Sequence, residues 1–182
     1  MQKLLTAAAS VLLFVNLAGN SANAQSVSVQ PISNNLCKAL APAGWSVGAT
    51  RGVNYTVISP DHGMTAAYGT AVMTRAQVQG FQGPQYRRPA LLAQYLAEVT
   101  TGEPIAVTAS HVDGTATTID FQSASKHGTV TFTAAANPSD PGGYSIALRI
   151  AIAGEMDDMP IAGAVAESID CGAAKPFQVS AR

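Results

Sequence analysis

Three histidines and a few carboxylates are the side chains of this chain whose types suit acid–base or metal chemistry. Asp61 and His62 are adjacent in a Ser-Pro-Asp-His-Gly motif, whereas His111, Asp120 and His127 come later. No H-x-x-x-H or H-x-H spacing places two histidines on one local surface, so the sequence predicts no metal site. A hydrolase that assembles Asp61, His62, His111 and Asp120 from separate strands is kept as an alternative function.

Other catalytic motifs are missing from the sequence. No serine lies in a G-x-S-x-G or S-x-x-K motif, and no glycine-rich phosphate loop occurs. The acidic cluster from Glu155 to Asp158 lacks the glycine and the spacing of a calcium-binding EF-hand loop. We therefore assign no catalytic residue, no metal and no cofactor from the sequence.

One segment suits the binding of a protein partner. The stretch from Thr74 to Arg88 has no sustained hydrophobic period and contains Phe81, Tyr86, Arg87 and Arg88 among glycines and glutamines. Aromatic and arginine side chains are favoured at protein interfaces, and long loops in compact domains are often functional. We predict that this loop, together with the exposed face of the sheet, contacts a partner; packing of the two aromatic rings into the core is the alternative.

Trp45 is the single tryptophan of the chain and opens a run of alternating residues. Aromatic side chains mostly serve packing, which favours a buried anchor at the start of a sheet. As an alternative, Trp45 binds a small ligand. A carrier protein would then have a pocket between sheet and helix, lined by Trp45 and Tyr95.

The N-terminus has the pattern of a secretory signal peptide. Lys3 precedes an apolar run from Leu4 to Leu17, and Ala22-Asn23-Ala24 matches the A-x-A cleavage motif. The run is shorter than the roughly 20 apolar residues of a membrane-spanning helix, and no cysteine stands at the cleavage point. We expect residues 1–24 to be removed near Ala24, which gives a periplasmic or secreted protein without a membrane anchor.

The mature chain has the size of one domain. Residues 25–172 are expected to form a single domain, followed by a flexible tail over 173–182. Removal of Lys3 leaves nine basic residues against the eleven acidic ones, a net charge of −2. Such a weak balance does not favour nucleic acid as a partner.

Cys37 and Cys171 are the only cysteines and lie near the two ends of the mature chain. An isolated pair in an oxidising compartment is most simply a disulfide. Closing so long a loop constrains the unfolded chain by about 5 kcal/mol in the entropy model. No C-x-x-C arrangement supports a redox role, so we predict a structural disulfide.

The elements that position these residues follow from hydrophobic periodicity. From Tyr144 to Ala153 isoleucine and leucine recur at every second residue, with Ser145, Ala147 and Arg149 on the opposite face, as in a half-buried strand. The run from Gly128 to Ala135 alternates in the same way, and an Asn-Pro-Ser-Asp-Pro-Gly-Gly turn joins the two. They are expected to be neighbouring antiparallel strands at the centre of a sheet.

The rest of the chain completes an α+β pattern. Expected strands cover residues 45–50, 53–58, 63–73, 105–112 and 115–123; expected helices cover residues 34–40, 89–101 and a segment from Pro160 with Ile161, Val165 and Ile169 on one face. Strand runs separated by a few helices predict a mainly antiparallel sheet flanked by two or three helices, an α-β-α sandwich.

A family resemblance agrees with this fold. The Ala-Gly-Trp-Ser-Val opening, the Ser-Pro-Asp-His-Gly turn into a long strand, the mid-chain helix and the closing Ala-Glu-Ser-Ile-Asp helix resemble the PsbP-like family. The resemblance implies an accessory or binding protein without catalysis of its own and transfers no site residue. Our expectation is an exported, non-enzymatic binding protein with an unknown protein partner.

Overall fold

A computed structural model describes residues 28–49, 52–76, 89–137, 139–172 and 177–178. The strands are β1 (Val29–Ser33), β2 (Cys37–Pro42), β3 (Ser46–Gly48), β4 (Tyr55–Ile58), β5 (Met64–Met73), β6 (Ala106–Asp113), β7 (Ala116–Gln122), β8 (His127–Ala136), β9 (Tyr144–Ala153), β10 (Asp170–Cys171) and β11 (Phe177–Gln178). The helices are α2 (Pro89–Thr101), the 3-10 turn η2 (Met156–Asp158) and α3 (Met159–Ser168).

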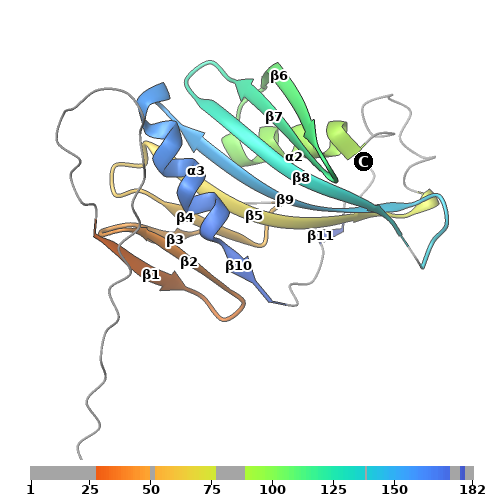
Figure 1. The fold of residues 1–182 in the computed structure, drawn as a ribbon, viewed down its shortest axis with the longest axis horizontal. Helices are drawn as coiled ribbons and strands as arrows, with labels where there is room; N and C mark the ends of the chain where they lie inside the picture. The colour runs from red at the N-terminus through yellow and green to blue at the C-terminus, as the bar shows by residue number, and fades with distance from the viewer. Residues whose placement is uncertain (1–27, 50–51, 77–88, 138, 173–176, 179–182) are drawn as a thin grey trace, which may run out of the picture.

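The strands form two sheets (Figure 1). The large sheet has the order β3-β4-β5-β9-β8-β7-β6 with antiparallel neighbours, and β11 adds a parallel pair to β5. The small sheet has the order β1-β2-β10. Two helices accompany these sheets in the described residues, which confirms the predicted α+β class.

Strand β9 occupies the centre of the large sheet, as its alternation predicted. It pairs with β5 on one side and with β8 on the other along its full length. Its four large apolar side chains are buried on one face: Ile146, Leu148, Ile150 and Ile152. Val130 and Phe132 of β8 join them on that face, so both strands were predicted with the correct orientation.

Helix α2 covers this apolar face. It begins at Pro89, whose missing N–H costs nothing in a first turn, and ends before Gly102, which adopts a left-handed φ of 74°. Its buried side chains are Leu92, Ala93, Leu96, Ala97 and Thr101. Leu91, Tyr95 and Val99 are half-buried and lie at the margin of this contact.

Helix α3 and the small sheet cover part of the opposite face, which gives the α-β-α layering (Figure 1). Ala162, Val165 and Ala166 of α3 pack with Ala66 of β5 and Ala151 of β9. Small side chains let the helix approach the strands closely. In the described residues no helix is long and apolar enough to span a membrane.

The predicted helix over residues 34–40 is wrong, because this segment is the turn and second strand of a hairpin. The Asn34 side-chain oxygen accepts hydrogen bonds from the backbone N–H groups of Leu36 and Cys37, at 2.9 and 2.7 Å. These bonds build a turn between β1 and β2 instead of an N-cap. Cys37, Ala39 and Ala41 then alternate into the core, as in a strand.

One expectation at the C-terminus also needs correction. The closing helix ends at Ser168, so Ile169 is buried just beyond it, and Ile161 remains 37% exposed because the helix meets the sheet through its small residues. Within the segment expected as a flexible tail, Phe177 and Gln178 form β11, which pairs with Ala71 and Val72 of β5. The other residues after Gly172 lie outside the described residues, so the flexibility of the tail stays a prediction.

The predicted disulfide is confirmed. Cys37 and Cys171 are directly opposite in the β2–β10 pair and are joined by an S–S bond of 1.98 Å. Lys38 and Asp170, the adjacent pair, form an ion pair of 3.1 Å whose side chains are largely exposed. Exposed ion pairs contribute little, so at this strand pair the covalent bond stabilises the link between β10 and β2 more than the ion pair does.

Replacing both Cys37 and Cys171 with alanine should lower the free energy of unfolding by about 2–5 kcal/mol, because the bond constrains a long loop in the unfolded chain. Urea denaturation of the oxidised wild type and the double variant measures the difference. Lys38→Ala serves as the control at the same strand pair and should cost less than about 1 kcal/mol. Equal stability of wild type and double variant would contradict a structural role.

Candidate functional site

The loop predicted to bind a partner is not part of the described structure. Phe81, Tyr86, Arg87 and Arg88 all lie outside the described residues, so their predicted role stays a prediction. The described chain reaches this segment through residues 74–76, directly after β5.

Trp45 is a packing residue. Its side chain is 6% exposed and lies in the cluster formed by β2, β4 and α3. Tyr95 of α2 packs against the other cluster, on the opposite face of the large sheet. The two aromatic side chains are separated by the sheet, so the predicted carrier pocket lined by both is wrong, and Trp45 is not available to a ligand at the surface.

The structure brings two of the candidate catalytic residues onto neighbouring strands: His111 on β6 and Asp120 on β7 lie on the same sheet face in successive cross-strand rows. The other two candidates lie apart from them. Asp61 and His62 lie in the turn between β4 and β5, His111 is on the edge strand β6, and His127 begins β8. Asp120 on β7 accepts a hydrogen bond of 2.9 Å from the Thr129 hydroxyl on the neighbouring strand. Among the described residues, no group of three histidine, cysteine or acidic side chains is close enough to hold a metal ion.

Asp61 closes its own turn. One oxygen of its carboxylate accepts hydrogen bonds from the Ser59 hydroxyl at 2.5 Å and from the Gly63 N–H at 3.0 Å. These bonds lower the pKa of the Asp61 carboxyl, with the Ser59 hydroxyl as the larger cause. His62 follows at a left-handed φ of 60°, and the Gly63 carbonyl accepts from Gly154 N–H at the end of β9. Asp61 and His62 are therefore structural residues of the turn that connects β4 and β5.

The structure brings together a different set of side chains, on the sheet face opposite α2. Pairing of β5, β9 and β8 aligns nine residues in three cross-strand rows, which we call the open face: Tyr68, Arg149 and Thr131; Thr70, Ala147 and Thr133; Val72, Ser145 and Ala135. All nine are exposed or half-buried. Ala66 and Ala151, one row further along, are buried under α3, so the open face begins where the helix ends its coverage.

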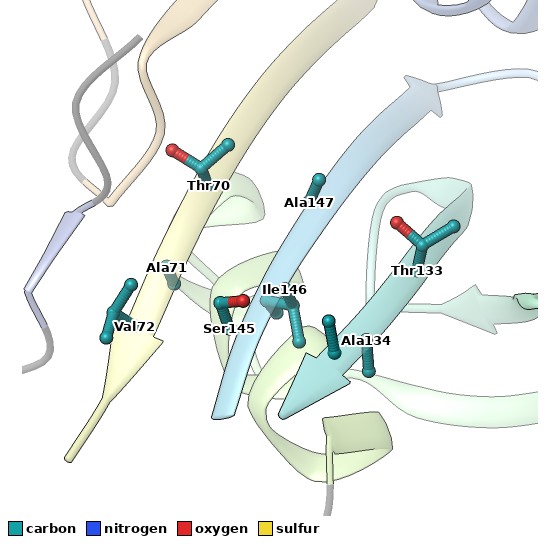
Figure 2. Close-up of a pocket in the computed structure, with 9 residues that line it drawn as sticks. Thr70, Ala71, Val72, Thr133, Ala134, Ser145, Ile146 and Ala147 are labelled. Atoms are coloured by element: carbon teal, nitrogen blue, oxygen red, sulfur yellow. The ribbon is translucent and has the colours of Figure 1, made fainter. Parts of the chain in front are cut away.

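A shallow hollow of about 310 Å³ lies on these three strands (Figure 2). Figure 2 shows Thr70 and Thr133 on either side of Ala147. Since the alanine side chain is short and its two neighbours are longer, the surface dips along β9. The hollow offers hydroxyl groups from Thr70, Thr133 and Ser145 in a setting of small apolar side chains.

Arg149 is the charged residue of the open face. Its guanidinium carbon lies 5.5 Å from the centroid of the Tyr68 ring, within the range of a cation–π contact. Its Nη2 donates to the Ile169 carbonyl at 3.3 Å, directly after α3. Among the described residues Arg149 makes no ion pair with a carboxylate. The guanidinium is therefore held in position by one ring and one carbonyl while N–H donors remain for another acceptor.

The sequence contained part of this site. The alternation of β9 placed Ser145, Ala147 and Arg149 on the face opposite the isoleucines, and the structure confirms that placement. The sequence also predicted β8 as the neighbour of β9, but the register of that pair and the pairing of β5 with β9 come from the structure.

No protein-family model matches the chain, and no curated protein matches it.

The lowered pKa of Asp61 predicts a pH-dependent effect. The ionised carboxylate contributes to stability above its unfolded pKa, and this contribution is lost as the pH falls through the lower folded pKa. Asp61→Asn should be less stable than the wild type at neutral pH, and the gap should close towards acid. Urea denaturation of both proteins over a pH series tests this. A gap that stays constant with pH would show that the charge of Asp61 does not matter.

Proposed function

We propose that this protein is an exported, non-enzymatic accessory or binding protein of the bacterial periplasm, and that a protein partner docks on the open face. The observation that carries the proposal is the pairing of Arg149 with Tyr68 beside a hollow of small polar residues. Arginine and tyrosine are enriched among the residues that dominate binding energy at protein interfaces.

Export is supported by two features. The first 24 residues, which lie outside the described structure, have the signal-peptide pattern. The disulfide between Cys37 and Cys171 suits an oxidising compartment. The resemblance to the PsbP-like family also implies an accessory role and stays a prediction.

The placement of the polar residues favours binding over hydrolysis. A hydrolase needs a nucleophile and a base within hydrogen-bond reach of each other. His111 and Asp120 lie in successive rows of the β6–β7 pair. Asp61 and His62, in the turn that leads into β5, are separated from β7 by β9 and β8, about 14 Å at the usual strand spacing. Asp61 and Asp120 are engaged with Ser59, Gly63 and Thr129 in their own neighbourhoods.

The chemistry of the open face also indicates what the partner presents. The Arg149 guanidinium can donate hydrogen bonds either to a carboxylate or to a backbone carbonyl of the partner. The surrounding threonines and Ser145 both donate and accept. Large apolar side chains are few among the nine residues, so we expect a polar, partly hydrated interface rather than a hydrophobic one. The loop with Phe81, Tyr86, Arg87 and Arg88 stays proposed as a second contact.

A photo-activated cross-linking residue at Thr133, on the rim of the hollow, should capture a discrete partner in the periplasm. The same residue placed at Lys38, which is exposed on the small sheet, is the matched control and should give no such adduct. Mass spectrometry of the adducts identifies the partner. Identical adducts from both positions would argue against a specific site on the open face.

Arg149→Glu in the Thr133 cross-linking protein should reduce the adduct by about tenfold or more, because a hydrogen bond to a charged group contributes about 1.5–3 kcal/mol. Lys38→Glu is the control for a change of surface charge. Since Arg149 also contacts the Ile169 carbonyl, Ala147→Trp gives an independent test by filling the hollow without touching that contact. Full adduct yield in both Arg149→Glu and Ala147→Trp would refute docking on this face.

A further inference from the structure

Strand β6 is an eight-residue edge strand of the large sheet. In the described residues it pairs with β7 alone, and all eight of its side chains are exposed. An edge strand presents a row of unpaired N–H and C=O groups that can pair with another strand. Natural edges are commonly protected by lysine, proline or very short strands, but β6 contains no lysine, arginine, glutamate or proline.

The other described edges carry such protection. At the far side of the large sheet, β3 has three residues. In the small sheet, β10 has two residues and β1 contains Pro31, which lacks a backbone donor. The protection of β6 is limited to a register irregularity between Val107 and Ala109, so a regular stretch follows from Ala109 to Asp113.

Two valines give this edge an apolar side. Val107 lies opposite Phe121, and Val112 lies opposite Thr117, so both point to the sheet face that α2 covers further along. They are 44% and 66% exposed. Ser110, opposite Ile119, lies between them on the same face.

We propose that a second copy of this chain pairs with β6 in an antiparallel arrangement, with a twofold axis beside Ser110. The irregularity accommodates Thr108 as the extra residue, so each Val107 lies opposite Val112 of the other copy, and each Ala109 lies opposite His111. Asp113, the single acidic residue of β6, then faces Ala106 instead of another carboxylate.

The strand itself favours a second copy over an unrelated strand. A twofold axis beside Ser110 gives two pairs of Val107 with Val112 on one face of the joined sheet, and it places no two like charges opposite each other. A twofold contact is also closed, because it joins the two β6 edges and leaves neither for further growth. β6 is separate from the nine residues of the open face, so this inference does not depend on the proposed partner site.

Sedimentation velocity of the mature, disulfide-bonded protein over a range of concentrations tests the proposal. The wild type should show a reversible monomer–dimer equilibrium. Val112→Lys should raise the dissociation constant at least tenfold, since a charge would then lie opposite Val107. Val47→Lys is the matched control, because Val47 is a similarly exposed valine (41%) on β3, the opposite edge of the same sheet, and this variant should dimerise normally.

Hydrogen exchange of the wild type gives a second reading that needs no substitution. Amides of residues 106–113 should become more protected as the protein concentration rises, while those of residues 46–48 should not change. A protein that is monomeric at every concentration, a dimer that Val112→Lys leaves intact, or equal dissociation by Val112→Lys and Val47→Lys would each overturn the proposal.

Discussion

The pairing of β9 with both β5 and β8 along its whole length is the constraint on which the other features of this fold depend. Because side chains alternate along a strand, this pairing gives the sheet one face of isoleucine, leucine and valine, and a second face of alanine, threonine, serine and arginine. The first face attracts α2 and forms the main core. The second face is divided between the contact with α3 and the open face.

This division follows from the lengths of the elements. Helix α3 has ten residues and spans about 15 Å, whereas β9 also has ten residues but extends over about 33 Å. The helix can therefore cover only part of β9. The small side chains Ala66, Ala151, Ala162 and Ala166 hold it over one end of the strand, and Ser145, Ala147 and Arg149 remain uncovered by it at the other.

The sequence predicted the elements whose signals are long and periodic, and it failed where a signal is short or non-local. The alternation of β8 and β9, the proline-initiated helix α2 and the disulfide were all predicted correctly. The helix over residues 34–40 was wrongly predicted because an asparagine oxygen can either cap a helix or close a turn. Here the pairing of β2 with β1 makes the segment a turn followed by a strand. The open face depends on the register between β5, β9 and β8, a tertiary property, so Arg149 was placed on the correct face without its neighbour Tyr68.

The Cys37–Cys171 disulfide helps to fix the position of Arg149, the candidate binding residue. Ile169, whose carbonyl accepts from Arg149, lies two residues before Cys171. Since Cys171 is bonded to β2, the segment between α3 and β10 has little freedom, and the carbonyl is held at a defined place beside the sheet. The guanidinium, between this carbonyl and the Tyr68 ring, is then held in one orientation. For the proposed docking on the open face, such preorganisation would lower the entropy cost of binding, about 0.5–1.5 kcal/mol for a side chain of this kind, and the disulfide would contribute to recognition by fixing the Ile169 carbonyl.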